Sequence, residues 1–451
     1  MPASAMRRPG GARRTGELGF WWRSLGGPPP ARPPLPGPAE ADVAIVGAGF
    51  TGLWTAYYLK RAQPSLRIVV LEREVAGFGA SGRNGGWVSG FFSGPQRLYE
   101  GRGGQAGFAA LRRAMFETVD EVGRFLTEHD VDADFVKGGH LSVALNEAQA
   151  FRLRDGVRRS RGHGLGEQDL RELSRAELEE RLRVAGARIA TYSPHVARVH
   201  PAKLLVGLAA AVERLGVMIH EDTPVSEIRP RAALTPAGIV RARWVVRATE
   251  GYTASLRGLR RALVPINSSM IITDPLSAGA WEEIGWAGSE TVSDAALAYV
   301  YLQRTADGRG ETARATIEGL HEKLVAMFPS AAQAEVDHAW SGVLGVPRDW
   351  CVSIVADPGA GLAWAGGYVG EGVAAANLAG RTLRDLMLGE PSSLTALPWV
   401  GRRPRRWEPE PIRWSAIRSV YSLYRRADRN ERRGRRPSRL GGFADALSGR
   451  G

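Results

Sequence analysis

Short apolar runs and helical segments alternate near the start of the chain. Residues 43–46 and 68–71 are rich in β-branched side chains, as the buried strands of a parallel sheet are. Residues 53–61, which lie between them, have the pattern of a helix. This strand–helix–strand order predicts an α/β fold built on a doubly wound, Rossmann-type sheet.

Further along the chain, apolar side chains at helical spacing predict a helix over residues 105–129 and an apolar helix over 204–215, entered through Pro201. The Arg and Glu content of residues 146–160 and 174–183 indicates helices on the surface. Short strands separated by turns are expected at residues 141–145, 217–219, 225–228, 239 and 244–248.

The segment from residue 263 to residue 303 has a different pattern, in which apolar and aromatic positions alternate. Its aromatic residues include Trp281, Trp286 and Tyr301. We expect an antiparallel sheet here that forms much of a second domain of α+β type. Residues 311–328 are expected to be helical.

The turn after the first strand predicts a binding site. Gly47, Gly49 and Gly52 form a G-x-G-x-x-G motif that opens a helix, and Glu72 ends the next strand twenty residues after Gly52. Such glycines allow a tight turn, close approach of the backbone to a pyrophosphate and close packing of helix on strand. The helix N-terminus attracts phosphate, and an acid at this distance accepts hydrogen bonds from ribose hydroxyls. The whole arrangement predicts a dinucleotide-binding unit.

Three further stretches carry glycines that suit a flat or anionic ligand. Residues 77–86 contain five glycines, so their backbone can lie against a flat ligand. Residues 249–252 form a second turn after a strand. Residues 364–373 end at a helix N-terminus, whose partial positive charge favours an electron-rich ligand atom. Glycine-bearing strand ends so far apart in the sequence indicate a ligand longer than one nucleotide.

Composition excludes several classes of protein. A chain of 451 residues exceeds what one hydrophobic core usually serves, so two domains are expected. The single cysteine, Cys351, excludes an internal disulfide framework and a metal site built from cysteines, and no metal is predicted. No apolar run approaches the roughly 20 residues of a membrane-spanning helix. Because the apolar stretch after Arg13 and Arg14 is too short for a signal-peptide core, we expect a cytoplasmic enzyme.

The net charge of +13 is concentrated at the two ends of the chain. Residues 401–451 hold fifteen arginines and five acidic residues, and residues 1–40 hold six arginines and two acidic residues. The segment between them is nearly neutral, which argues against a nucleic-acid-binding core. We interpret residues 401–451 as a solvated, partly helical basic tail, with attraction to an anionic surface or a partner as the alternative. Residues 1–40 are interpreted as a poorly ordered, proline-rich lead-in in which residues 20–22 (FWW) form a small aromatic anchor.

These patterns divide the chain into two domains between the lead-in and the tail. The nucleotide-binding domain is expected to be discontinuous and to combine residues 41–100, 198–260 and 352–400. The substrate domain is expected to combine residues 101–197 and 261–351.

The chain resembles the D-amino-acid-oxidase-like superfamily of FAD-dependent oxidoreductases, and within it the bacterial branch that includes gamma-glutamylputrescine oxidoreductase. Five segments carry the resemblance, in the same order and across about residues 40–400. They are DVAIVGAGFTGLWTAYYL (42–59), GFGASGRNGG (77–86), HPAKL (200–204), RATEGY (247–252) and GGYVGEGVAAANLAGRTL (366–383).

The resemblance implies FAD as the cofactor and assigns a part of it to each segment. The glycine motif would hold the pyrophosphate, Glu72 the adenosine ribose and Val225 the adenine, while residues 81–86 would run past the ribityl chain to the flavin. The turn before residue 373 would face the flavin O2 and stabilise the anionic reduced flavin. The implied FAD contacts are Gly47, Gly49, Phe50, Thr51, Gly52, Glu72, Arg73, Gly79, Ala80, Ser81, Arg83, Asn84, Gly85, Gly86, Val225, Thr249, Gly251, Gly367, Gly370, Gly372 and Val373. Cys351 does not match the position at which some relatives attach FAD, so we expect non-covalent FAD and a small buried thiol.

The chain departs from the family pattern after residue 309. Relatives continue through a further strand and a glycine-containing loop, whereas here Gly310 and Glu311 are expected to pass directly into a helix. The absent segment lies in the substrate domain, near the flavin in relatives. Its loss would widen the pocket, change the substrate or impair activity.

The activity that the resemblance implies is oxidation of a CH–NH bond in an amine or amino acid to an imine, with oxygen or another acceptor reoxidising the flavin. We assign no catalytic residue, because binding of the neutral amine removes the need for a dedicated base. Arg304 and Arg348 are the groups best suited to hold a substrate carboxylate. The full set of substrate-pocket candidates is Tyr299, Tyr301, Arg304, Arg348 and Tyr368, and His200 and His338 are expected to have structural roles.

Two alternatives stay open. The first is a catalytically weakened flavoprotein that acts mainly as a binding or assembly partner, which the shortened segment and the basic tail suggest. The second is a flavin monooxygenase, although the sequence has no second nucleotide-binding unit for NAD(P)H.

Overall fold

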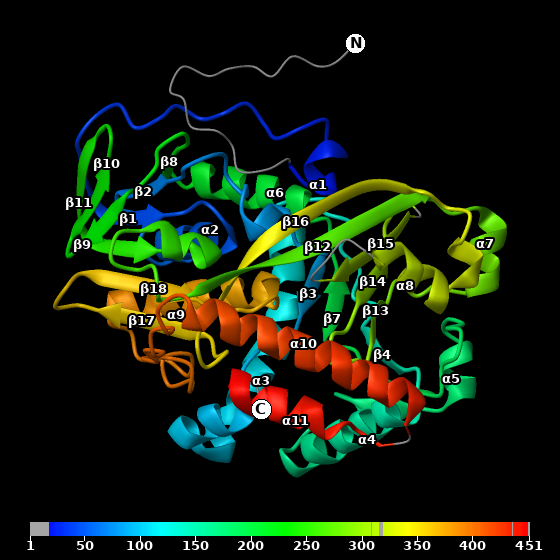
Figure 1. The fold of residues 1–451 in the computed structure, drawn as a ribbon. Coiled ribbons are helices and arrows are strands. Elements are labelled where there is room, and N and C mark those ends of the chain that lie inside the picture. The colour runs from blue at the N-terminus through cyan, green and yellow to red at the C-terminus, as the bar shows by residue number, and fades with distance from the viewer. Residues whose placement is uncertain (1–17, 308, 315–318, 435, 450–451) are drawn as a thin grey trace.

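Two large sheets lie side by side in the computed structural model of this chain, which describes residues 18–307, 309–314, 319–434 and 436–449 (Figure 1). One sheet is mostly parallel and the other mostly antiparallel. The predicted fold class, an α/β domain joined to a second domain with an antiparallel sheet, is confirmed.

The first sheet brings together strands from three distant parts of the chain. Val43 in its central strand pairs in parallel with Ile68 on one side and with Trp244 on the other. Across the sheet the order is β17 (Ser353–Asp357), β18 (Leu362–Gly366), β11 (Gly238–Arg247), β1 (Ala39–Val46), β2 (Ile68–Leu71) and β8 (Met218–His220), with β10 (Ala232–Thr235) and β9 (Glu227–Arg229) beside β11.

Four helices share the main hydrophobic core with this sheet. Trp54 and Leu53 are fully buried there, and Gly380 allows close helix packing because a Cβ at that position would lie 2.8 Å from Cβ of Trp54. The helices are α2 (Phe50–Ala62), α3 (Gln96–Glu128), α6 (Pro201–Arg214) and α9 (Gly372–Leu388). The predicted helices at residues 53–61, 105–129 and 204–215 are thus confirmed. Within α3 the chain is kinked at Gly104, whose φ of 63° is not helical, so the helix predicted from residue 105 begins directly after the kink.

The second sheet has one apolar and one polar face. Leu141, Val292 and Leu302 point to a separate core shared with helices α7 (Ala278–Ile284) and α8 (Leu320–Met327), whereas His140 and Ser293 bond to each other on the opposite face. The strands, in order, are β16 (Val336–Val346), β12 (Val264–Pro275), β15 (Arg309–Arg314), β14 (Tyr301–Arg304), β13 (Thr291–Asp294), β4 (His140–Ala144), β6 (Ile189–Ser193) and β5 (Arg171–Leu173).

The long strands β12 and β16 reach from this sheet toward the first one (Figure 1). Smaller elements fill the remaining connections. They are β3 (Trp87–Ser89), which pairs with β7 (Val196–Arg198), helices α4 (Glu147–Gly162) and α5 (Arg175–Glu179), and the short 3₁₀ helices η1 (Ala80–Gly82), η2 (Glu250–Ser255) and η3 (Pro329–Ala331).

Three predictions about the second domain and its surroundings are wrong in part. Residues 309–314 form strand β15, which pairs with β12 and β14, so residue 311 does not enter a helix; the helix begins only at Leu320, after Gly319 in the left-handed region. Residues 315–318 lie outside the described part of the chain. Trp281 lies on helix α7 rather than on a strand, and the strand expected at 225–228 begins at Glu227, which leaves Val225 in a loop.

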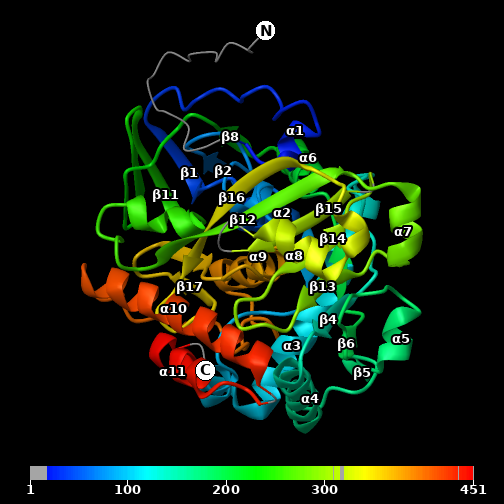
Figure 2. The same cartoon turned by 45° about the vertical axis from the view of Figure 1, so that its right-hand side comes forward.

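The ends of the chain pack on the two domains. Residues 18–40 are not a loose lead-in, because Arg32 forms ion pairs with Glu213 and Glu221, and helix α1 (Phe20–Arg23) is buried. The C-terminal helices α10 (Ile412–Arg433) and α11 (Arg439–Ser448) lie against each other across the front of the molecule (Figures 1 and 2). The predicted partly helical tail is confirmed, although Glu431, in an ion pair with Arg152, is buried rather than solvated.

None of the helices in the described part of the chain is both long enough and apolar enough to span a membrane.

Candidate functional site

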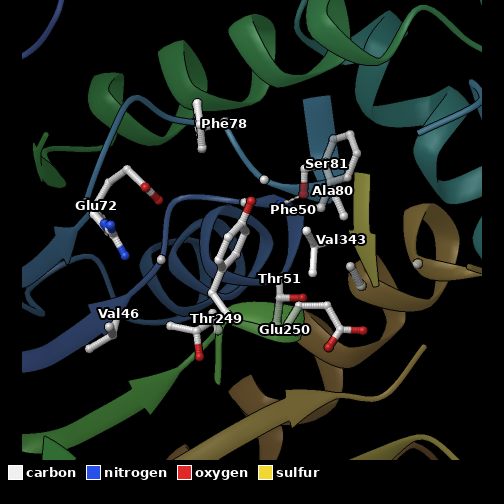
Figure 3. Close-up of a pocket in the computed structure, with 18 of the residues that line it drawn as sticks. Val46, Phe50, Thr51, Glu72, Phe78, Ala80, Ser81, Thr249, Glu250 and Val343 are labelled. Atoms are coloured by element: carbon white, nitrogen blue, oxygen red, sulfur yellow. Dashed lines mark hydrogen bonds between the residues drawn. The ribbon is translucent and has the colours of Figure 1, made fainter. Parts of the chain in front are cut away.

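A long cleft opens at the carboxyl ends of the parallel strands, where doubly wound sheets place ligand sites. The space inside it, with the solvent at its open mouth included, is about 1200 Å³. Glu72 lies at one end and Val343 at the other, with Ser81 above and Thr249 below (Figure 3). An extended ligand fits this shape better than a compact one.

The glycine motif forms one wall of the cleft, and each glycine is required by a close contact. Gly47 has φ of 104°, and a Cβ there would lie 2.7 Å from the Ala248 carbonyl oxygen. A Cβ on Gly52 would lie 2.0 Å from the Gly47 carbonyl oxygen, which would force α2 away from β1. Gly49 is the N-cap of α2, so the helix begins where the chain passes closest to the cleft. The motif therefore leaves room for a phosphate group at a helix N-terminus.

Glu72 is held in place by backbone N–H groups. Its two carboxylate oxygens accept hydrogen bonds from the N–H of Ala48 at 2.8 Å and of Glu74 at 3.0 Å. Burial raises the pKa of the Glu72 carboxyl above its usual range, against the opposing effect of these two hydrogen bonds. Because a carboxylate has about four acceptor sites, the fixed side chain can still accept hydrogen bonds from ribose hydroxyls.

The loop of residues 77–86 covers the cleft from the opposite side. Ser81 joins it to the glycine motif, because its Oγ accepts a hydrogen bond from the N–H of Phe50 at 2.9 Å. Asn84 closes the loop on itself, since its side chain donates to the Ser81 carbonyl and accepts from the Gly86 N–H. Arg83 turns away, and its guanidinium bonds to the carbonyl oxygens of Phe78 and Ser341. The loop is thus a rigid cover whose small residues face the cleft.

The far end of the cleft is formed by a turn between β18 and α9. Tyr368 in this turn is buried, and its hydroxyl lies 2.9 Å from Oγ1 of Thr51 on α2, so a hydrogen bond joins the segments at the N-termini of α9 and α2. Gly370 and Gly372 line the cleft immediately before α9. Val343 and Leu344 of β16 complete this end, which means that the second sheet contributes to the same cleft.

Glu250 is the least expected side chain at the far end. It lies at φ of 39°, and its carboxylate accepts hydrogen bonds from the N–H groups of Gly367 at 3.3 Å and Tyr368 at 3.1 Å. The Glu250 side chain fits here because residue 345 is a glycine: a Cβ at Gly345 would lie 2.6 Å from a carboxylate oxygen of Glu250. Burial raises the pKa of the Glu250 carboxyl to about 7, which these hydrogen bonds and Arg247 oppose.

Most of the predicted cofactor contacts line this one cleft although they come from four parts of the chain. The residues brought together are Gly47, Gly49, Phe50, Thr51, Glu72, Arg73, Gly79, Ala80, Ser81, Asn84, Val225, Thr249, Gly370, Gly372 and Val373. Six others are not among the residues that line it, namely Gly52, Arg83, Gly85, Gly86, Gly251 and Gly367.

The predicted substrate residues are not brought together. Tyr368 lines the cleft, but Arg304 donates to the Trp286 carbonyl and lies over the Trp281 ring, and Arg348 pairs with Glu408. Tyr301 lies on β14 at 5.1 Å from the ring of Trp87, and Tyr299 is 41% exposed. The structure therefore does not bring Arg304 or Arg348 to the cleft as carboxylate-binding groups.

The structural roles expected for three other residues are confirmed. His200 caps α6 through Nδ1, which accepts a hydrogen bond from the Lys203 N–H, and His338 stacks on Trp340. Cys351 is a free thiol that is 1% exposed, and burial raises its pKa to about 12.

Sequence reasoning missed several residues that line the cleft. Glu250 and Tyr252 lie within RATEGY, so their position after a strand was the available signal; for the β16 residues no local pattern gave one. The missed residues include Glu74, Phe78, Glu250, Tyr252, Leu256, Val343 and Leu344.

Comparison with known families identifies the fold and its cofactor class. The sequence model of the DAO family, described as FAD dependent oxidoreductase, matches residues 42–386. The chain belongs to this family. The match thus begins within β1 and ends within α9, and residues 18–41 and 387–449 lie outside it.

Curated relatives of this DAO-family chain match it over most of their length. It is 29% identical to the probable oxidoreductase OrdL of Haemophilus influenzae, over 80% of this chain and 86% of the relative. It is 27% identical to the gamma-glutamylputrescine oxidoreductase of Escherichia coli, over 81% of this chain and 89% of that relative. Among solved structures, glycine oxidase from Geobacillus kaustophilus has a TM-score of 0.68 at 20% identity, covering 81% of this chain and all of that one, which shows a shared fold.

The residues present fit FAD. A cleft with a helix N-terminus and a glycine turn near each end suits a ligand with a pyrophosphate in the middle and an electron-rich ring at one end. Side chains at the glycine motif would not fit, because a Cβ on Gly47 would lie 2.7 Å from the Ala248 carbonyl oxygen and a Cβ on Gly49 would lie 2.8 Å from Ser81 Oγ.

Proposed function

We propose that this DAO-family oxidoreductase binds FAD non-covalently in the cleft and oxidises the CH–NH bond of a small amine or amino acid to an imine. One observation carries the proposal: Val343 and Leu344 of the second sheet line the same cleft as Gly370 and Gly372 of the nucleotide-binding half. The cleft therefore ends between the two halves, where a substrate held on one would meet a ring held on the other.

The orientation of FAD follows from the two ends of the cleft. Glu72 and the glycine motif would hold the ribose and pyrophosphate, and the turn from Gly367 to Gly372 would face the flavin. The distribution of strands supports a division of the chain in which residues 41–100, 198–260 and 352–400 bind FAD and residues 101–197 and 261–351 bind substrate.

The bound flavin would supply the redox chemistry, since it accepts a hydride equivalent from the carbon that carries the amine. The protein's own residues would orient the neutral amine and exclude water. The N–H groups in the first turn of α9 would favour negative charge on the ring, whereas those of Gly367 and Tyr368 donate to Glu250. Loss of a hydride and a proton from the CH–NH unit leaves a C=N bond, and water hydrolyses this imine after it is released.

The test is anaerobic bleaching of the purified protein's flavin with polyamines, gamma-glutamyl amines, N-methyl amino acids and D-amino acids. At least one class is expected to reduce the flavin, and readmitted oxygen or an artificial acceptor would restore its colour. If the protein carries FAD that no CH–NH donor reduces, the enzyme proposal fails in favour of a binding flavoprotein. Rapid oxidation of NADPH would instead favour a monooxygenase.

A further inference from the structure

The segment of residues 18–24 lies before the family domain but packs into it. Phe20, Trp21 and Trp22 are 6%, 3% and 1% exposed, and all three belong to the main core around the first sheet. We call residues 18–24 the aromatic strap. It contacts helix α6, strand β16 and the loop of residues 77–86 that covers the cleft.

Two indole N–H groups hold consecutive carbonyl groups of this loop. Nε1 of Trp21 donates to the Asn84 carbonyl oxygen at 2.7 Å, and Nε1 of Trp340 on β16 donates to the Arg83 carbonyl oxygen at 2.9 Å. The two indoles contact each other, with ring centroids 6.4 Å apart. The loop is therefore fixed from behind by one residue from the strap and one from the second sheet.

Trp22 supports the same loop by shape alone. A Cβ on Gly77 would lie 3.1 Å from its ring, and a Cβ on Gly82 would lie 2.4 Å from its Nε1, so the ring fits against the two glycines that bound the turn. Among the described residues this Nε1 has no hydrogen-bond partner. Trp21 and Trp22 thus differ in one respect that an experiment can use: only the first donates a hydrogen bond to the loop.

The strap is itself anchored on its other side, which allows it to position the loop rather than follow it. Oγ of Ser24 lies 2.9 Å from the Trp21 carbonyl oxygen, to which it donates, and 3.0 Å from Nε2 of His200. The His200 ring also packs edge-on against Trp21 at 4.9 Å and caps helix α6. His200 of the α6 N-terminus thus holds the aromatic strap, and the strap in turn holds the loop.

The hydrogen bonds also act on the peptide groups that they join. A carbonyl that accepts a hydrogen bond polarises its peptide, so the N–H of the next residue becomes a better donor. The two peptides concerned carry the N–H groups of Asn84 and Gly85. Asn84 lines the cleft, and Gly85 is the next residue of the same loop.

We propose that Trp21 and Trp340 are positioning residues for bound FAD: they fix the backbone of the loop at residues 83–85 and strengthen its N–H groups as donors to the cofactor. The proposal rests on the cleft binding FAD but on no particular substrate. Both indoles therefore raise the affinity for FAD and favour the more electron-rich, reduced cofactor.

The test compares four Trp→Phe variants of the full chain. In each, the dissociation constant for FAD is measured by titration of apoprotein, and the midpoint potential of the bound flavin is measured against reference dyes. Trp21→Phe and Trp340→Phe each remove one hydrogen bond, which corresponds to a weakening of FAD binding by roughly two- to tenfold. The midpoint potential is expected to become more negative in both.

Two matched variants separate the hydrogen bond from the loss of ring volume. Trp22→Phe makes the same change on the same loop without losing a hydrogen bond, so a smaller loss of affinity and an unchanged potential are expected. Trp399→Phe is a control in the same core, because Trp399 is fully buried, its Nε1 has no described partner, and it does not line the cleft.

The proposal is overturned if folded Trp21→Phe and Trp340→Phe proteins match Trp399→Phe in both FAD affinity and potential. A fall in affinity that is equal in Trp21→Phe and Trp22→Phe, with no change in potential, would also overturn it, because that result describes packing alone. If Trp21→Phe does not fold, Trp340→Phe decides, since it acts on the same loop from the other domain. Wild-type protein that binds no FAD would contradict the proposed function instead.

Discussion

The two ends of the cleft are built in different ways. At the nucleotide end, Gly47, Gly49, Gly52 and Glu72 come from one strand–helix–strand unit. At the flavin end, the walls come from β16, from the turn before α9 and from Glu250, which are far apart in the sequence. The first end is a local motif and the second is an assembly of three segments. We therefore expect substitutions at the nucleotide end to abolish FAD binding and substitutions at the flavin end to change the FAD affinity by a smaller factor.

The largest effect is expected from Gly52→Ala at the nucleotide end. The added Cβ would lie 2.0 Å from the Gly47 carbonyl oxygen, so α2 must move away from β1 and the phosphate site is lost. FAD binding is expected to weaken by at least about 100-fold, as for the severe core changes of several kcal/mol, measured as flavin retained after gel filtration. The control is Gly156→Ala on α4, where a Cβ meets nothing within 4 Å. Retention of FAD by the Gly52→Ala protein would contradict the assigned wall.

A smaller effect is expected where the two ends are joined. Tyr368→Phe removes the hydrogen bond between the Tyr368 hydroxyl and Oγ1 of Thr51, and FAD binding should weaken roughly two- to tenfold. Tyr192→Phe is the matched control, because it removes a hydroxyl that donates to the Gly138 carbonyl in the second domain. Equal FAD dissociation constants for the two variants would show that the bridge does not support binding.

At the flavin end, Glu250 predicts a dependence of stability on pH. Its folded-state pKa is about 7, above the value of 4.5 for a free carboxyl, so ionisation is disfavoured by folding and the contribution of Glu250 to stability falls between pH 4.5 and pH 7. Glu250→Gln cannot ionise. We therefore compare the melting temperature of Glu250→Gln with that of wild type at each pH. The difference, variant minus wild type, is expected to be roughly 1–3 °C larger at pH 8 than at pH 5.

The exposed Glu390, in an ion pair with Arg384, provides the comparison for this change. Glu390→Gln is expected to shift the melting temperature by the same small amount at both pH values. A Glu250→Gln difference that is also independent of pH would mean that Glu250 is solvated rather than buried in the cleft wall.

The smallest effect is expected for Arg348, which sequence analysis placed in the substrate pocket. Because its guanidinium pairs with Glu408 and donates to the Ser448 carbonyl, Arg348→Gln should leave KM for the best substrate within about twofold of wild type. Arg304→Gln should behave in the same way. A rise in KM of about tenfold or more for either variant would return that arginine to the substrate site.

The contrast between the two ends also explains what the sequence could predict. The glycine motif and Glu72 act through neighbours in the chain, so their spacing alone indicated the nucleotide end. The turn at residues 364–373 was recognised because glycines preceded a helix. The contribution of Val343 and Leu344 depends on the pairing of β12 with β16, and no local pattern specifies that register.

The errors in the second domain have the same origin. Residues 309–314 form β15 because they pair with β12 on one side and with β14 on the other. The residues of β15 do not themselves indicate this pairing. Arg304 and Arg348 are not among the residues that line the cleft, and the sequence alone could not indicate this because Arg side chains suit carboxylates of substrate and protein equally well. The aromatic residues 20–22 were recognised as an anchor, but their contact with the loop at residues 77–86 required the structure.

The central claim, that this cleft holds FAD without a covalent bond, is tested most directly by denaturing the purified protein and identifying the flavin released. The account predicts that the supernatant contains FAD at about one molecule per chain and that the precipitated protein is colourless. Protein that releases no flavin, releases only FMN or keeps its colour after precipitation would contradict the account.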